Sequence, residues 1–537
     1  MSLARNTAVI GGLTLVSRLF GLARDLLLAA ALGAGPVADA FYAALRFPNL
    51  FRRLFAEGAF SQAFVPVYSK TLATEGRDAA DKLAGEALSI LLAITGVLSA
   101  LAILAMPWIN RVLFAGYVDD PATFALATTL TQITMPYLVC MTAATLFSGA
   151  LNARGKFFVA AAAPILLNLC LLVAVWPFQH DQIAAAYSAA VAVSVAGLLQ
   201  AAWVWWGAHR AGAGLRVTAP RMTPAVGRLV ALAVPGAIAG GALQINVLVS
   251  QALASFEQGA ITYLNYADRL YQLPLGLIGI AVGVAMLPRL SRLVQAGDEA
   301  GARGALDEAV ALSMAFTLPA AAAILAIPFF LIDGLFTRGE FTADDARAVA
   351  QALVHYGWGV PAFVLAKIYA PAFFAREDTK APMRYALTSM ALNIALGAAL
   401  FFGLRGMGVA GFPGLAIATS AAAWLNVALM IRSLVARGAY GPTPSAFARL
   451  LRILFAAAAL FGVLWLADAN RAALEARFGS KEGAALFVIL SAGVFYFALA
   501  FIVRAVSFAE VRGAFRRERG SNDSAGSGGG LPPGLDG

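Results

Sequence analysis

Long apolar segments run along nearly the whole chain and decide what it can fold into. A helix needs roughly 20 largely apolar residues to cross a bilayer, and fourteen segments meet this requirement if a few internal charges are allowed. Hydrophobic residues make up 61% of the 537 and charged residues 13%, whereas about a quarter of a typical soluble protein is charged. We therefore predict an all-α integral membrane protein. The expected spans are 6–33, 37–69, 83–108, 122–151, 157–177, 182–208, 225–254, 259–288, 305–332, 346–375, 382–403, 409–431, 447–467 and 482–504.

Basic residues in the loops predict how these spans are oriented. If the N-terminus is cytoplasmic, the loops and ends on that side hold 25 Lys and Arg, and the opposite loops hold 6. Such an excess is typical of cytoplasmic loops. We therefore expect a multi-pass protein of the bacterial inner membrane with both termini in the cytoplasm. This topology explains the net charge of +10 without nucleic-acid binding. The first apolar stretch has no small-residue cleavage site, so we expect a span there and not a signal peptide.

The chain also repeats itself weakly. Four short segments recur with offsets of about 222–225 residues, and each repeat holds six expected spans. An even number of spans gives both repeats the same orientation, and two parallel repeats with the substrate path between them form a known transporter plan. The matching segments are Ala8–Gly11 with Ala233–Gly236, Val65–Pro66 with Leu287–Pro288, Ala153–Lys156 with Ala375–Lys380, and Asn168 with Asn393.

The repeats predict the domain organisation. We expect two six-helix lobes around a central cavity, with two extra C-terminal helices outside the repeat. The tail is basic and then rich in Gly and Ser, a composition typical of disorder. The expected units are the N-terminal lobe 1–208, a cytoplasmic linker 209–224, the C-terminal lobe 225–438, the extra helices 439–506 and a disordered cytoplasmic tail 507–537.

Charged residues inside the expected spans indicate a function. A charge at the bilayer centre costs at least about 2.5–3.5 kcal/mol on insertion scales, so these residues should face a water-filled cavity or each other. Ion pairs of Arg24 or Arg18 with Asp25, Arg53 with Glu57, and Arg269 with Asp268 would be a purely structural explanation. That explanation leaves an excess of positive charge, because seven cations accompany four anions. The cations are Arg18, Arg24, Arg46, Arg52, Arg53, Arg269 and Lys367, and the anions are Asp25, Asp39, Glu57 and Asp268.

The residue types favour an anionic substrate. Arg46, Asn49, Arg53 and Glu57 are spaced 3, 4 and 4 residues apart, so they form one polar stripe on a helix. A kink at Pro48 or near Gly21 would turn further arginines toward the same cavity. Arginine binds phosphate through two parallel hydrogen bonds and keeps its charge. The cavity should therefore bind a phosphate or a diphosphate.

Metal and redox chemistry have little support in the sequence. Cys140 and Cys170 both lie in apolar runs, and the chain has three histidines, so we predict neither a disulfide framework nor a metal site. No cofactor is expected. His355 beside Trp358 could relay protons, but a single histidine in a membrane span is at least as well explained as a packed or pore-lining residue.

Several segments resemble the MurJ (MviN) lipid II flippases of the MOP exporter superfamily, and the resemblance extends to about residue 505. The block Pro48–Pro66, which reads PNLFRRLFAEGAFSQAFVP, is highly specific to that family. The other matching segments are Ser17–Asp25, Ala38–Phe41, Tyr266–Leu270 and Ala375–Pro382.

The resemblance implies a fold with fourteen helices in two lobes and a transport function without covalent catalysis. Lipid II, the undecaprenyl-diphosphate-linked peptidoglycan precursor, would move from the cytoplasmic to the periplasmic leaflet by alternating access. The family's cavity arginines correspond to Arg18, Arg24, Arg52 and Arg269, with Asp25, Asp39, Arg46, Arg53, Glu57 and Asp268 as supporting charges.

The resemblance also implies a groove for the polyprenyl tail at the last two helices. Membrane lipids and the cell-wall synthesis machinery are further expected partners. Some relatives have a glutamate where this chain has Gln272, so a mechanism that needs a carboxylate there does not carry over. Neither the energy source nor a coupling ion can be assigned from the sequence.

Four alternatives stay open at this stage. A flippase for another polyprenyl-linked glycan would use the same cationic cavity. A drug or cation antiporter would have mainly carboxylates in the spans. A glycosyltransferase that polymerises lipid II would need catalytic carboxylates in a large outer loop, and the expected outer loops are short. A division scaffold would not need a cationic cavity.

Overall fold

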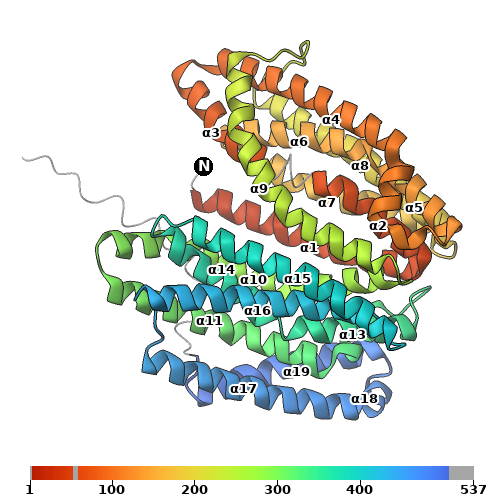
Figure 1. The fold of residues 1–537 in the computed structure, drawn as a ribbon, viewed down its shortest axis with the longest axis vertical. Helices are drawn as coiled ribbons and strands as arrows, with labels where there is room; N and C mark the ends of the chain where they lie inside the picture. Colours follow the sequence, from red (N-terminus) through yellow and green to blue (C-terminus); the bar gives the residue numbers. More distant parts are fainter. Residues whose placement is uncertain (1–2, 52–58, 507–537) are drawn as a thin grey trace, which may run out of the picture.

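The chain folds into a bundle of long helices (Figure 1). The computed structural model describes residues 3–51 and 59–506, apart from the side chains of 3–10, 51, 59–62, 235–243 and 277–285. Within these ranges the secondary structure is helical and contains no strand. The α-helices are α1 (Leu3–Leu32), α2 (Pro36–Phe51), α3 (Ala59–Thr74), α4 (Arg77–Leu113), α5 (Pro121–Thr134), α6 (Pro136–Ala153), α7 (Phe157–Val175), α8 (Gln182–Arg210), α9 (Pro224–Ala254), α10 (Ala260–Gln295), α11 (Glu299–Ala326), α12 (Pro328–Phe336), α13 (Ala343–Gly357), α14 (Val360–Phe374), α15 (Lys380–Gly406), α16 (Phe412–Ala436), α17 (Pro444–Ala469), α18 (Arg471–Phe478) and α19 (Lys481–Ile502). Two short 3₁₀ helices, η2 (Ala115–Tyr117) and η3 (Trp176–Phe178), also occur.

Helices lie at every expected span, but some spans consist of two helices. The span expected at 122–151 breaks between α5 and α6, where Pro136 begins the second helix, and the one at 305–332 breaks at Pro328. Proline has no backbone N–H to donate and is well tolerated in the first turn of a helix, which explains both positions. The kink expected near Gly21 is not a break, because α1 is continuous through it.

Length and composition support a multi-pass membrane protein. Among the described residues, ten segments are long and apolar enough to cross a membrane.

The bundle has two halves. In the first half α1 packs on α7, and α8 packs on α6 and α7; in the second half α10 packs on α11, α13 and α14, and α15 packs on α16. The first half lies above the second in Figure 1, and α9 crosses between them, in contact with α3, α4 and α15. Helices α17 and α19 cover the outer side of the second half, against α11 and α12.

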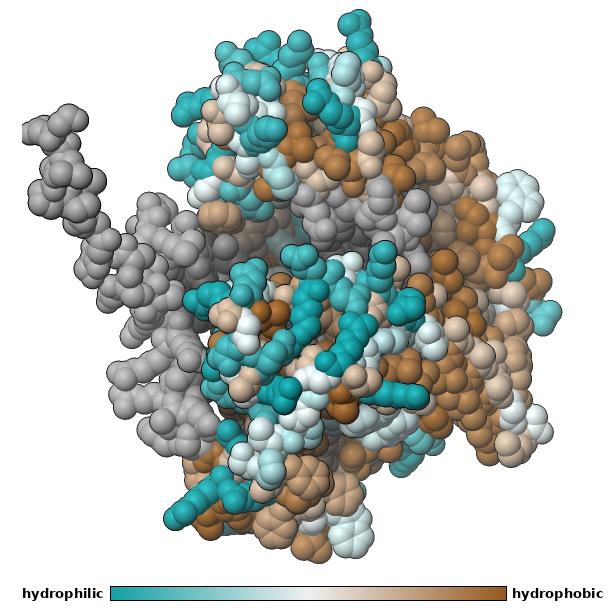
Figure 2. Space-filling view, turned by 60° about the vertical axis from the view of Figure 1, so that its left-hand side comes forward, coloured by the Kyte–Doolittle hydropathy of each residue, from teal (hydrophilic) through white to brown (hydrophobic). Residues whose placement is uncertain are grey.

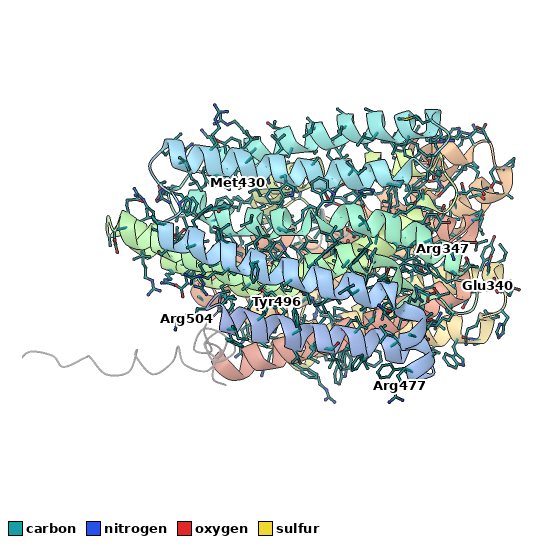
Figure 3. All side chains as sticks on the ribbon, turned by 90° about the horizontal axis from the view of Figure 1, so that it is seen from below. Glu340, Arg347, Met430, Arg477, Tyr496 and Arg504 are labelled. Carbon is teal, nitrogen blue, oxygen red and sulfur yellow. The ribbon has the colours of Figure 1, made fainter. Side chains whose placement is uncertain are left out.

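The two ends of the bundle differ in how the halves meet. We call the end where α1 begins the near end and the end where α1 finishes the far end. Arg504 lies at the near end, whereas Glu340, Arg347 and Arg477 lie at the far end (Figure 3). At the near end a hollow separates the halves (Figure 2). Leu15 and Leu19, on the part of α1 toward this end, are 58% and 60% exposed.

At the far end the backbones of the two halves touch. The Glu340 N–H donates to the Ala30 carbonyl at 2.8 Å. Gly33 and Gly339 both have positive φ, and a Cβ on either would collide with the backbone of Glu340 or Ala30, respectively. Glycine permits both the left-handed conformation and this close approach. The halves are therefore closed against each other at the far end, whereas the described residues leave a hollow between them at the near end.

In each half, a buried carboxylate binds the chain segment that follows the last helix of that half. In the first half, Asp81 on α4 accepts hydrogen bonds from Gly214 N–H, the Tyr68 hydroxyl and Arg154. In the second half, Asp307 on α11 accepts hydrogen bonds from the Tyr440 hydroxyl and from Thr443. These segments are thus fixed to the near end of their own half.

A charged cluster attaches α17–α19 to the second half at the far end. Arg471 begins α18 and pairs with Asp333 of α12 and with Glu475. Its guanidinium lies 4.7 Å from the Phe329 ring centroid, and Lys481 of α19 lies 3.6 Å from Asp333. The Asp333 side chain is 8% exposed and that of Arg471 16%, so this cluster is largely shielded from water.

We predict that Asp333→Asn destabilises the protein by roughly 2–4 kcal/mol, because it leaves two cations in a shielded site without this carboxylate. Unfolding in mixed micelles with increasing dodecyl sulfate measures the change. The control is Arg347→Met, which removes a pair with Asp344 whose side chains are 62% and 88% exposed. The control should change stability by about 0.5 kcal/mol or less. Equal losses in both variants would contradict the structural role of Asp333.

Candidate functional site

A polar cavity lies between the two halves, in the interior of the bundle. Its volume is about 260 Å³, and α1, α2, α6, α7, α8, α9 and α10 contribute to its wall. The first half supplies Arg24, Asp25 and Arg46, whereas α10 of the second half supplies Asp268 and Arg269. Charges that the sequence placed in separate spans therefore meet at one site.

A second cavity, of about 490 Å³, adjoins the first. Arg18 and Lys367 line it, and Arg24, Asp25, Arg269 and Gln272 line both cavities. Together the described walls carry five cationic side chains and two carboxylates. The cations are Arg18, Arg24, Arg46, Arg269 and Lys367, and the carboxylates are Asp25 and Asp268. The site as a whole is suited to an anion.

Asp25 lies at the centre of this charge network. One of its oxygens accepts hydrogen bonds from Arg24 Nη2 at 2.7 Å and Nε at 3.0 Å, and the other lies 3.5 Å from Arg269 Nε. The Arg24 and Asp25 side chains are 13% and 11% exposed, whereas that of Arg269 is 49% exposed. Arg269 therefore keeps a large part of its surface accessible in the cavity while it connects the two halves through Asp25.

Asn168 of α7 orients Arg24. Its Oδ1 accepts a hydrogen bond from Arg24 Nη1 at 2.8 Å, and its Nδ2 donates to the Ser17 carbonyl at 3.0 Å. A Cβ on Gly21 would lie 3.7 Å from the Asn168 amide, an ordinary contact distance, so α1 passes close to Asn168 at this position. This arrangement turns Arg24 toward the same cavity as Arg18 without a break in α1.

The purely structural explanation by ion pairs holds for Arg24 with Asp25 but not for Arg269 with Asp268. Arg269 pairs with Asp25 of the other half, and Asp268 instead accepts a hydrogen bond from Gln272. Adjacent residues on a helix point about 100° apart, whereas residues four apart lie on the same face. Gln272 therefore fills the position next to Asp268 and lines both cavities.

Asp39 does not support the arginines as predicted. It is fully buried and accepts hydrogen bonds from Gly259 N–H at 2.7 Å, Thr262 N–H at 2.8 Å and the Thr262 hydroxyl at 2.6 Å. The first N–H groups of a helix have no acceptor within the helix. Asp39, which lies in the other half, accepts hydrogen bonds from two such groups at the start of α10. Tyr42 adds a hydrogen bond to the Tyr266 hydroxyl at 2.9 Å. Asp39 and Tyr42 thus hold the far end closed.

The other predicted residues fall into three groups. Arg46 and Asn49 of the polar stripe line the first cavity, and Arg46 donates to Asn265 Oδ1 at 3.2 Å. Arg52, Arg53 and Glu57 lie outside the described residues. His355 lines neither cavity, and its carbonyl accepts a hydrogen bond from the Ser420 hydroxyl.

Four neutral amides of the site were not predicted as site residues. Asn168, Asn265, Gln244 and Gln251 all contact the cavities or their arginines. A search for charges misses them, although the seven-residue spacing of Gln244 and Gln251 in an apolar helix was a usable signal. Within the described ranges, no group of three or more His, Cys, Asp or Glu side chains could hold a metal ion.

Comparison with known proteins places the chain in a family. Residues 28–474 match the family model described as lipid II flippase MurJ. This chain belongs to the MurJ family. A probable lipid II flippase MurJ from Rhizobium meliloti (strain 1021) is 41% identical over 528 residues, which cover 96% of this chain and 97% of that protein.

Solved structures agree with this assignment. A lipid II flippase MurJ in an inward closed conformation superimposes with a TM-score of 0.75 and 25% identity, covering 93% of this chain and 99% of that one. An inward-facing MATE multidrug resistance transporter of the MOP superfamily has the same fold, with a TM-score of 0.63 and 12% identity, covering 83% of this chain and 98% of that one. The likeness to the MATE transporter shows a shared fold.

We predict that Asp39→Ala opens the far end. The substitution leaves two buried N–H groups and a hydroxyl without their acceptor, at about 1–3 kcal/mol each. In a chain with Cys140→Ala and Cys170→Ala, a cysteine introduced by Gln272→Cys should then react roughly tenfold to a hundredfold faster with an impermeant maleimide applied from the far side.

Thr262→Ser is the matched control, because it keeps the hydroxyl that bonds to Asp39. It should leave the far-side labelling rate unchanged. If Asp39→Ala is labelled no faster than this control, Asp39 does not close the far end.

Proposed function

We propose that this protein is a lipid II flippase, which moves the undecaprenyl-diphosphate-linked precursor of peptidoglycan from the cytoplasmic to the periplasmic leaflet by alternating access. The observation that carries the proposal is the arginine-rich cavity between two halves that are closed at the far end only. Membership of the MurJ family supplies the substrate. A diphosphate is the part of this lipid that a cationic cavity recognises.

The orientation in the membrane follows from the loop charges. We propose fourteen spans, with the near end and both termini in the cytoplasm of a bacterium and the far end in the periplasm. The distribution of 25 basic residues against 6 supports this orientation. The cavity is then closed to the periplasm and adjoins a hollow that faces the cytoplasm, which is the side where the substrate enters.

The two halves act as repeated lobes, 1–208 and 225–438, joined by the linker 209–224. Two matched pairs of residues support this proposal. Asp81 and Asp307 hold the chain after the last helix of their lobes. Asn168 contacts Arg24 of α1, and Asn393 donates to Asn246 of α9. A pseudo-symmetric pair of rigid lobes can rock about a central site.

Substrate binding would weaken the far-end closure. The diphosphate and Asp25 compete for the same donors, the guanidinium groups of Arg24 and Arg269. When the diphosphate takes these donors, the Asp25–Arg269 pair between the lobes is lost. Closure then depends on Asp39, Tyr42 and the glycine contacts, so the lobes can separate at the periplasmic side.

Transport needs no covalent step, so its direction requires another source of free energy. A membrane potential of 100 mV is worth about 2.3 kcal/mol for each charge moved. Periplasmic enzymes of cell-wall synthesis that consume the lipid would also draw it outward. We further propose that the tail rests in a groove at 439–506, where outward residues such as Leu454 and Phe455 are 52% and 60% exposed.

We predict that single changes of Arg18, Arg24, Arg52 or Arg269 to Ala lower flipping by roughly tenfold to a hundredfold. Each change removes charge-assisted hydrogen bonds worth about 1.5–3 kcal/mol. The measurement is the exposure of lipid II on the periplasmic face of cells depleted of their own flippase, at matched protein abundance.

Arg405→Ala is the control, because Arg405 is exposed at the far end and lines neither cavity. It should flip as the wild type does. A wild-type protein that inserts correctly but exposes no lipid II points to another polyprenyl-linked glycan. Arginine variants as active as Arg405→Ala would show that the arginines are structural.

A further inference from the structure

One face of α9 forms a neutral wall of the first cavity. Gln244, Val247, Leu248 and Gln251 all line it. Their spacing of 3, 4 and 7 residues places them on a single face of the helix. The two glutamines thus lie two turns apart, with an apolar patch between them.

Gln251 is buried, and the hydrogen-bonding capacity of its side-chain amide is not satisfied. Only 7% of the residue is exposed, and its Oε1 has no hydrogen-bond partner. An unpaired buried carbonyl lowers stability, and native proteins rarely keep one without a reason. Gln244 also makes no side-chain hydrogen bond with a described residue. Two amides therefore line the cavity with their donors and acceptors unused.

The charged part of the cavity wall has a different chemistry. Arg24, Arg46 and Arg269 can only donate hydrogen bonds, and Asp25 and Asp268 can only accept them when ionised. A glutamine side chain offers both a carbonyl and an NH₂ group. Its natural complement is another uncharged amide, whose N–H can donate to Oε1 while its carbonyl accepts from Nε2.

We propose that Gln244 and Gln251 form a subsite for an uncharged secondary amide of the substrate head group, while the arginines hold the diphosphate. This inference rests on the proposed flippase function. The amide can come from the acetamido groups of the sugars or from the peptide. The subsite gives the cavity a means to tell a complete head group from a bare polyprenyl diphosphate.

Binding of four defined lipids to the full-length protein in nanodiscs tests the subsite. The lipids are undecaprenyl diphosphate alone, the same diphosphate with an N-acetylated disaccharide, that disaccharide with hydroxyls in place of its acetamido groups, and the complete disaccharide-peptide. Gln251→Leu and Gln244→Leu should each weaken binding of the complete lipid about tenfold and leave binding of the bare diphosphate unchanged.

The lipid series identifies the source of the amide. A loss already present for the peptide-free acetylated disaccharide, and absent for its hydroxyl analogue, assigns the subsite to the sugar. A loss seen only with the complete lipid assigns it to the peptide. Equal weakening of all four lipids, or of none, overturns the subsite. A wild-type protein that binds none of them overturns the proposed function itself.

Gln200→Leu is the matched control. Gln200 of α8 is buried with an unpartnered Oε1, as Gln251 is, but it lines neither cavity. Its replacement should not change any of the four affinities. Thermal unfolding separates binding from folding, because Gln251→Leu without ligand should unfold at or above the wild-type temperature. A lower unfolding temperature, with equal loss of all affinities, would assign Gln251 a structural role.

Discussion

The rest of the site depends on the ion pairs that the Asp25 carboxylate makes with Arg24 and Arg269. The carboxylate neutralises part of a strongly cationic cavity, and it joins Arg24 of one half to Arg269 of the other. Without an anion at this position, the guanidinium groups of Arg24 and Arg269 would repel each other. In the proposed mechanism, a substrate diphosphate takes the same place with more charge. Occupancy of the site is then connected to the contact between the halves.

The other contacts described above either close the far end or hold each half together. Asp39 and the paired glycines Gly33 and Gly339 close the far end through backbone contacts. Asp81 and Asp307 fix the following chain segments to their own halves, and Arg471 holds α17–α19 to the second half. In the proposed mechanism each half moves as a body, and the few contacts between the halves decide which end is open.

The sequence predicted the helical membrane fold and several cavity residues, because apolar length and buried charge are local properties of the chain. Pairing with the neighbouring residue holds for Arg24 and Asp25. For Arg269 the same structural explanation named Asp268, whereas the carboxylate that it contacts lies on another helix. Asp39 looked like a support for arginines, although it caps α10 across the halves. The neutral glutamines of α9 carry no charge to draw attention, and only the fold shows that they share a wall with Arg24.

A structure of the protein with an undecaprenyl-diphosphate-linked disaccharide bound tests the central claim most directly. The account predicts that diphosphate oxygens lie within hydrogen-bonding distance of both Arg24 and Arg269, and that the contact between Asp25 and Arg269 is lost. A diphosphate bound outside the cavity, with Arg24, Asp25 and Arg269 arranged as they are without substrate, would contradict it.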